Sequence, residues 1–145
     1  MYDAHINQLE IIMKIKTEEL KGVALDYAVA IANGVNSKII RLSKPSLTTW
    51  MLDEDGSYTG QYMTGPSLIF SRWETAGPII EKEMIQLNPS GVGDNAWTAR
   101  IKQKLPPGMN GYFEKSGSSP LIAAMRCYVA SKLGEVVNVP KELNQ

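Results

Sequence analysis

The clearest periodic pattern of apolar residues lies between Ser119 and Gly134. Apolar side chains recur there at helical spacing on one face: Leu121, Ile122, Met125, Val129 and Leu133. Ser119 suits the N-cap, and Pro120 suits the first helical position, where its missing N–H costs nothing. Gly134 accepts the positive φ of a helix stop. The pattern predicts a helix over residues 120–133.

A second helical pattern covers residues 18–33. Its apolar positions follow the i, i+3, i+4 rule: Leu20, Val23, Ala24, Tyr27, Ala28 and Ile31. Thr17 precedes two glutamates and is expected to cap this helix. Gly22 costs helix stability of about 1 kcal/mol relative to alanine, which predicts close packing against a neighbour there.

Alternating patterns between the helices predict strands at residues 11–15, 38–42, 48–52, 58–63, 97–104 and 112–113. Pro78 is expected to open a short helix that ends at Glu83, and the three valines of residues 136–139 predict an extended tail. Strands clustered in the middle predict an α+β fold. We expect a mostly antiparallel sheet with the two main helices, about 18–33 and 120–133, packed on one face.

Composition indicates one compact domain. The 145 residues are 43% hydrophobic and 21% charged, and 15 basic residues balance 15 acidic ones. This balance disfavours a general nucleic-acid or membrane-surface binder and leaves open a local basic patch. Residues 1–12 carry no clear period and are interpreted as an N-terminal extension, with residues 13–145 as a single α+β domain. With a single cysteine, no leader pattern and no apolar run near ~20 residues, we expect a cytoplasmic protein.

The residue inventory argues against familiar catalytic sets. His5 is the only histidine and Cys127 the only cysteine, which disfavours Ser-His and Cys-His nucleophile systems as well as transition-metal clusters. The acidic run at residues 53–55 lacks the spacing of a calcium loop and is interpreted as a solvated turn. We therefore expect no catalytic residues, no metal site and no cofactor. A hydrolase that uses carboxylates alone remains open.

Three features suit a small anionic ligand. At the corner of residues 116–120, Ser118 and Ser119 offer hydroxyl groups beside helix amides, where a phosphate or carboxylate fits. The alternative is that Ser119 only caps the helix.

Aromatic side chains form the second feature. Tyr58 and Tyr62 flank Gly60 on a predicted strand, and a slot of this kind can stack a flat base, with Trp73 and Trp50 as further walls. Ordinary cross-strand packing is the alternative.

Basic side chains form the third. Arg100 lies with Lys102 and Lys104 on one face of a predicted strand, where they either contact phosphates or guard a solvated edge. Arg72, which precedes a tryptophan in a loop bounded by Gly-Pro pairs, is a further candidate. Arg126 is another, and it either contacts a phosphate bidentately or pairs with Glu74 or Asp26.

Three stretches of the chain resemble the phage NinX-type family of small accessory proteins. They are MKIKTEELKGVALDYAVAIANG (13–34), RWETAGPIIEKEMIQL (72–87) and PLIAAMRCYVASKLGEVVNVPKEL (120–143). The last is the most specific, whereas residues 35–71 match weakly. The family's central loop usually carries an aspartate where this chain has Arg72.

The resemblance implies phage accessory biology and no particular reaction. Such proteins often counter host defence, and one route is to bind and sequester a nucleotide-derived immune signal, for example a cyclic nucleotide or an ADP-ribose derivative. A homo-oligomer is then expected, because sponges of this kind often bind ligands between protomers. The alternatives are a protein-binding inhibitor without a small-molecule pocket and an enzyme that degrades the signal.

Overall fold

The structure is a computed structural model that describes residues 12–34, 49–52, 58–64 and 72–143. Its three helices are α2 (Gly22–Ala32), α3 (Trp73–Glu83) and α4 (Pro120–Leu133). Its strands are β1 (Ile12–Lys16), β2 (Thr49–Leu52), β3 (Tyr58–Thr64), β4 (Gln86–Pro89), β5 (Trp97–Lys102), β6 (Tyr112–Gly117) and β7 (Val136–Pro140). Short 3-10 turns lie at Thr17–Glu19 (η1), Gly93–Asn95 (η3) and Lys141–Leu143 (η4). The predicted α+β class is confirmed.

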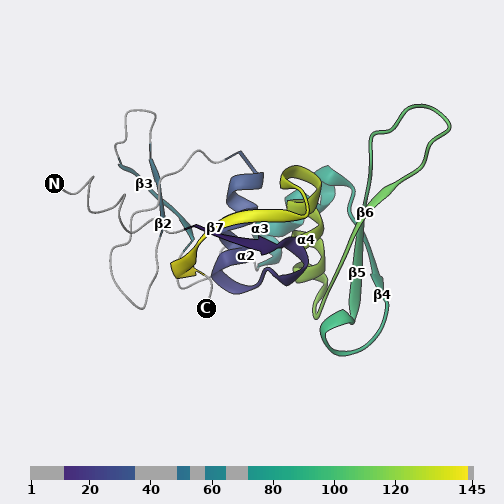
Figure 1. Ribbon diagram of the computed structural model, residues 1–145, viewed down its shortest axis with the longest axis horizontal. Helices are drawn as coiled ribbons and strands as arrows, with labels where there is room; N and C mark the ends of the chain where they lie inside the picture. Colours follow the sequence, from purple (N-terminus) through teal and green to yellow (C-terminus); the bar gives the residue numbers. More distant parts are fainter. Residues whose placement is uncertain (1–11, 35–48, 53–57, 65–71, 144–145) are drawn as a thin grey trace.

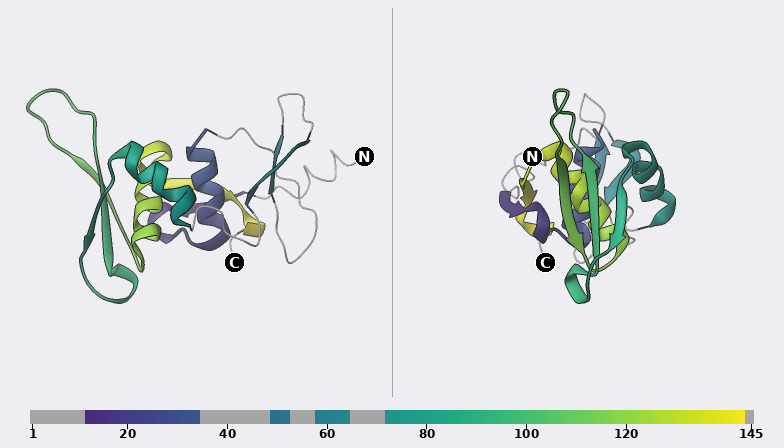
Figure 2. Two further views of the ribbon diagram at one scale, coloured as in Figure 1. Left: turned by 180° about the vertical axis from the view of Figure 1, so that it is seen from behind. Right: turned by 90° about the vertical axis from the view of Figure 1, so that its right-hand side faces the viewer.

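All strand pairs among the described residues are antiparallel, as predicted. They form three separate ladders: β1 with β7, β2 with β3, and the three-stranded sheet β4–β5–β6. The helices lie behind one face of the three-stranded sheet (Figure 2, right). The division into three ladders adds a detail that strand patterns cannot provide, because they do not specify which strands pair.

Helix α4 is the central element of the molecule. It lies between the three-stranded sheet and α2 (Figure 1) and also contacts α3. Met125 and Val129 of the predicted apolar face are buried, but so are Ala123, Ala124 and Cys127 on the other sides. Leu133, by contrast, is 37% exposed. The helix is therefore buried on most sides, and its small residues let neighbouring elements approach closely.

The predicted alternation along β5 is confirmed. Ala99 and Ile101 face the core, whereas Arg100 and Lys102 face solvent. The strand ends at Lys102, two residues earlier than predicted. This sheet thus has one face on α4 and one polar face in water.

The start of the first long helix differs from the prediction. Residues 17–19 form the turn η1, and α2 begins only at Gly22. Gly22 has φ of 57° and no heavy atom within 4 Å of an added Cβ, so it serves backbone conformation and not close packing. Thr17 does not cap the helix. The chain turns at Thr17 beside the end of α4, and the Thr17 hydroxyl therefore donates to the carbonyl oxygen of Gly134 at 2.7 Å.

Helix α3 begins at Trp73, five residues before the predicted start at Pro78. A proline in this position removes one helical hydrogen bond. Ala76 and Ile79 are buried on either side of it, and this burial stabilises the helical turn before the proline, which was expected to lie outside the helix. The helix stops at Met84, which has φ of 54°.

The chain end forms strand β7, which pairs with β1 and confirms the extended tail. Val137 lies opposite Ile15 and Val139 opposite Met13. Both valines are buried, whereas Val136 is 49% exposed. The predicted strand at residues 38–42, the turn at residues 53–56 and the N-terminal extension up to residue 11 lie outside the described residues.

Candidate functional site

A polar pocket of about 460 Å³ lies beside the middle of α4. Four segments distant in sequence build it: η1 with the turn after it, η3, the end of β6, and α4. Its lining residues are charged or polar: Glu18, Glu19, Lys21, Asp94, Asn95, Glu114, Lys115, Ser116, Ser118 and Arg126. Its volume falls in the usual range for small-molecule sites, about 300–1,000 Å³.

Arg126 is fixed in place at this pocket by two backbone carbonyl groups. Its Nε donates to the oxygen of Leu20 at 2.8 Å, and its Nη1 donates to the oxygen of Ser116 at 2.9 Å. The first carbonyl follows η1 and the second belongs to β6, so one guanidinium group joins both walls. A guanidinium has five N–H groups, and these two bonds use two of them.

Burial lowers the pKa of Arg126 from its ordinary value. The carboxylates of Asp94 and Glu18 act in the opposite direction, because negative charge nearby favours the protonated guanidinium. An arginine remains charged at physiological pH despite such a shift. The pocket therefore holds a half-buried, oriented positive charge.

The pocket as a whole carries both signs of charge. Four carboxylates line it, from Glu18, Glu19, Asp94 and Glu114, against three cationic side chains. Lys115 is ion-paired with Glu135, outside the lining, and its side chain is only 12% exposed. A polyanion would meet repulsion from this rim, whereas a ligand that carries an anionic group and several hydrogen-bond donors matches it.

The start of α4 adds one hydroxyl group to the pocket. Ser118 is exposed and belongs to the lining. Ser119 is the predicted N-cap: its side chain accepts from the backbone N–H of Ile122 at 3.2 Å, which confirms that local prediction. Because Pro120 has no N–H, few amides at this helix start are left for a ligand. Gly117 lies so close to the helix that an added Cβ would be 2.7 Å from the Ala123 nitrogen.

Of the sequence-predicted site residues, Ser118 and Arg126 share the pocket lining, and Arg72 and Trp73 do not. Arg72 forms an ion pair with Glu74 at 3.5 Å at the start of α3, with both side chains largely exposed. Trp73 is 55% exposed. Glu74, considered as a partner for Arg126, is thus paired with Arg72.

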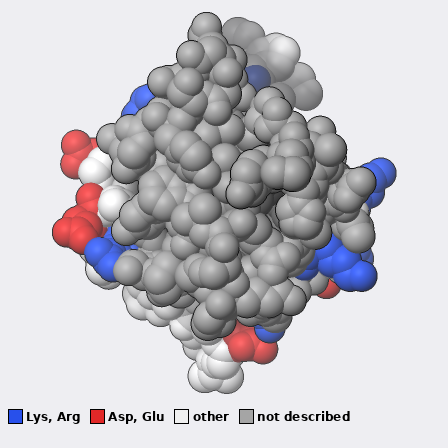
Figure 3. All heavy atoms as spheres, turned by 90° about the vertical axis from the view of Figure 1, so that its left-hand side faces the viewer, with Lys and Arg blue, Asp and Glu red and all other residues white. Residues whose placement is uncertain are grey.

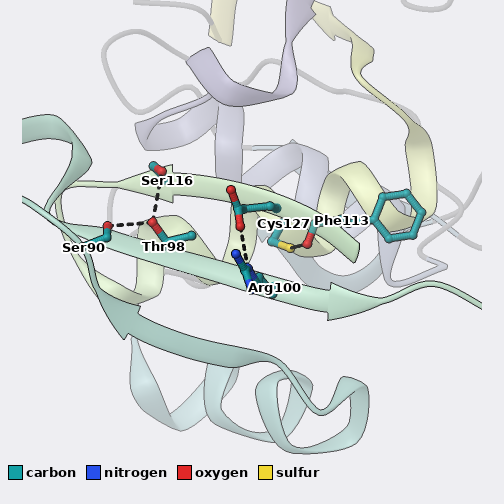
Figure 4. A network of polar contacts seen from close by, with 7 residues as sticks. Ser90, Thr98, Arg100, Phe113, Ser116 and Cys127 are labelled. Carbon is teal, nitrogen blue, oxygen red and sulfur yellow. Dashed lines mark hydrogen bonds and ion pairs between the residues drawn. The ribbon is translucent and has the colours of Figure 1, made fainter. Parts of the chain in front are cut away.

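Arg100 lies on the solvent face of β5, in the network that Figure 4 shows. Its guanidinium pairs with Glu114 across the β5–β6 ladder and lies 5.6 Å from the centre of the Tyr112 ring. On the same face, the Thr98 hydroxyl donates to Ser90 at 2.6 Å. The Arg100 side chain thus belongs to a polar network between neighbouring strands, which explains its position without a ligand.

The aromatic slot falls on β2 and β3, where the structure describes backbone alone. The register places Tyr62 opposite Trp50 and Tyr58 opposite Leu52. The side chains of these residues lie outside the description. The slot therefore stays a prediction.

Described residues line two further pockets. One, of about 230 Å³, is mainly apolar and lies between α2, the end of α4 and β7; the other, of about 480 Å³, lies within the loop between β5 and β6. Acidic and basic side chains intermix around the rim of the face in Figure 3. Within the described ranges, no group of three or more His, Cys, Asp or Glu residues is placed to hold a metal ion. None of the described helices has the length and apolar character needed to cross a bilayer.

Several pocket residues were missed at the level of sequence. Lys21, Asp94, Glu114 and Lys115 come from segments that only the tertiary fold brings together. Ser116 also lines the pocket and lies within the corner of residues 116–120, where only Ser118 and Ser119 were named as ligand-binding candidates. The only feature of these residues that the local sequence shows is a charged side chain next to turn residues. That feature is common on protein surfaces and does not indicate a pocket.

Fold and pocket define a small α+β protein with a polar pocket of mixed charge against its central helix. The model of the family described as Bacteriophage P22, NinX matches residues 16–132, so the chain belongs to that family. The chain is therefore a phage accessory protein. No curated protein matches it significantly.

Proposed function

We propose that this phage accessory protein counters host defence by binding a nucleotide-derived immune signal in the pocket beside Arg126 and sequestering it. The observation that carries the proposal is the oriented guanidinium of Arg126, held by the carbonyl groups of Leu20 and Ser116. Planar guanidinium groups bind phosphate through paired hydrogen bonds, and orientation by the protein reduces the entropy lost on binding.

The mixed charge of the pocket favours a nucleotide over a simple anion. A nucleotide derivative carries a phosphate for Arg126 and Ser118, and it also carries ribose hydroxyl and base amino groups. Those donors suit the carboxylates of Glu18, Glu19 and Asp94 on the rim. Inorganic phosphate lacks the ribose and base donors that face the carboxylates, so we expect it to bind much more weakly.

Calorimetry with the purified chain tests this proposal. The panel contains cyclic dinucleotides, ADP-ribose and cyclic ADP-ribose variants, with inorganic phosphate as the comparator. We expect one of the nucleotides to bind, and the variants Ser118→Ala and Arg126→Met to weaken that binding. Arg72→Gln serves as the matched control, because Arg72 lies outside the pocket lining. No binding across the panel, or equal weakening by the control, would contradict the proposal.

The fate of the bound ligand separates sequestration from degradation. A sponge releases its ligand unchanged when the protein is denatured by heat, whereas an enzyme releases product. Chromatography of the supernatant distinguishes the two outcomes. Sedimentation of the complex then tests whether the expected homo-oligomer forms.

A second candidate function is inhibition of a host or phage protein by direct contact. Large apolar side chains that are exposed in the described part of the chain favour it: Val92 at 90%, Met84 at 82% and Trp73 at 55%. Capture of one defined partner from host lysate by the wild type, but not by Trp73→Ser, would support this function. If the pocket variants capture the same partner as the wild type does, partner binding and ligand binding are separate functions.

A further inference from the structure

The loop between β5 and β6, residues 103–111, is the tip of a projecting arm (residues 101–113) that neither proposed function uses. The two strands carry it away from the helices and the rest of the body (Figures 1 and 2). We refer to these nine residues as the arm tip. Its position leaves it accessible from several sides.

Local contacts hold the arm tip in a defined shape. The Gln103 N–H donates to the Gly111 oxygen at 2.9 Å, and the Met109 N–H donates to the Pro106 oxygen at 3.1 Å. The second bond closes a four-residue turn with Pro107 and Gly108 in the middle, and Gly108 has φ of 87°. Proline followed by a glycine of positive φ is the composition of a type II turn, which is preorganised.

The apolar residues of the arm tip face solvent. Met109 is 59% exposed and Leu105 is 38% exposed, and both prolines of the turn are exposed as well. Exposed apolar side chains that gather on one projection are typical of an interaction site.

The charge of the arm identifies the chemistry of that partner. Lys102 and Lys104 are exposed, and residues 101–113 contain no acidic residue. Lys102 is the last residue of β5 and Lys104 lies two positions further on, so a fully extended backbone would place their Cα atoms about 6.8 Å apart. That distance is close to the separation of neighbouring phosphates along one strand of a DNA duplex, so the two lysines can reach two adjacent phosphates. The nearest arginine, Arg100, is already paired with Glu114.

We propose that the arm binds duplex DNA, with Lys102 and Lys104 against the phosphates and the Pro106–Met109 turn inserted into the minor groove. Two-stranded β-ribbons of DNA-binding proteins enter either the major or the minor groove. Proline, leucine and methionine are among the side chains that insert between base steps and bend the duplex. A protein partner would meet the same apolar residues, but two lysines without a carboxylate favour the polyanionic surface.

Fluorescence anisotropy with a labelled duplex tests the phosphate contacts. Two contacts predict a slope of about −1.8 for log affinity against log salt, so affinity falls roughly tenfold between 50 and 200 mM salt. Lys102→Gln/Lys104→Gln removes most of this dependence. The control Lys82→Gln/Lys141→Gln removes the same charge from exposed positions outside the arm and leaves the slope unchanged.

A bending assay tests the apolar turn separately. Energy transfer between dyes at the duplex ends increases on binding of the wild type, and Met109→Ser reduces this increase while it preserves the salt slope. Absence of duplex binding at 50 mM salt overturns the proposal, as does an equal effect of the two double variants. If Met109→Ser abolishes self-association of the protein and leaves DNA binding and bending unchanged, the proposal is overturned. The arm tip would then bind a second copy of the chain.

Discussion

Thr17 and Gly134 lie 117 positions apart in sequence, yet the Thr17 hydroxyl donates to the Gly134 carbonyl oxygen at 2.7 Å. The neighbouring Thr17 N–H donates to the Glu135 oxygen at 2.9 Å, so this residue joins the end of β1 to the end of α4. Thr17 is fully buried.

Thr17→Val should therefore lower the free energy of unfolding by about 1–3 kcal/mol. The substitution keeps the shape but leaves the Gly134 carbonyl without this donor. Thr17→Ser retains the hydroxyl and is the matched control, with a smaller loss. Urea unfolding followed by circular dichroism measures both variants, and equal stability of wild type and Thr17→Val would contradict the assignment.

The two serines before α4 should differ in what they support. Ser119→Ala removes the cap on the Ile122 N–H and is expected to cost about 1 kcal/mol of stability. Ser118→Ala removes an exposed hydroxyl and should change stability by less than about 0.5 kcal/mol. The same pair tested by calorimetry reports on ligand binding, where we expect the larger loss from Ser118→Ala.

Alanine replacements at two glycine positions should differ in their effect on stability. An added Cβ at Gly117 would lie 2.7 Å from the Ala123 nitrogen and 2.8 Å from Ile122 Cγ2, so Gly117→Ala must displace β6 from α4. We expect a loss of about 1–3 kcal/mol. Gly77, within α3, has no heavy atom within 4 Å of an added Cβ apart from its chain neighbours. The gain in helix propensity of Gly77→Ala is opposed by the Pro78 ring, which disfavours a helical conformation for a preceding residue with a Cβ, so we expect stability to change by less than about 1 kcal/mol. Thermal unfolding of both variants checks the contrast.

Local signals in the sequence predicted local structure well. The Ser119-Pro120 start and the Gly134 end gave the bounds of α4, and alternation gave the inner and outer faces of β5. These features depend on residues close in sequence, so their physical causes are visible there. The Pro78 prediction was wrong because burial of Ala76 and Ile79 stabilised a helical turn that the proline alone disfavours.

The candidate site depended on contacts that no local pattern reports. Arg126 was considered as a partner for carboxylates, but its guanidinium bonds two backbone carbonyl groups. A carbonyl acceptor has no signature in a sequence, because every residue carries one. The acidic rim likewise arises from η1, η3 and β6, whose proximity follows from the packing of α4 against both the turn and the sheet.

Cys127 should make the protein less stable at alkaline pH. Burial raises the pKa of this thiol from its ordinary value of 9.0 to about 12, and its Sγ lies 3.2 Å from the Phe113 oxygen, to which it donates. Above pH 9 the unfolded chain loses the proton while the folded chain keeps it. The unfolded state then binds fewer protons, so stability falls by up to about 1.4 kcal/mol per pH unit until the folded thiol ionises near pH 12.

Cys127→Ala should flatten this decline. Burial also raises the pKa of Tyr128 above its ordinary value of 10.0, which contributes a loss of the same sign and leaves a residual slope in the variant. Urea unfolding at pH 7 to 10.5 measures the effect. A thiol reagent at pH 8 should also react with the unfolded chain much faster than with the native one, since the native thiol is neutral and buried.

Arg126 should combine a structural and a binding role that substitutions can separate. Arg126→Met leaves the Leu20 and Ser116 carbonyl groups without their donors, and we expect a loss of about 2 kcal/mol in unfolding free energy. Arg126→Lys keeps the positive charge but cannot offer the same pair of directed N–H groups, so it should recover part of the stability and little of the nucleotide affinity. Unfolding and calorimetry on both variants, with Ser118→Ala beside them, distinguish the roles. If Arg126→Lys binds nucleotide as tightly as the wild type, charge alone governs the pocket, and the fixed geometry of the guanidinium has no part in recognition.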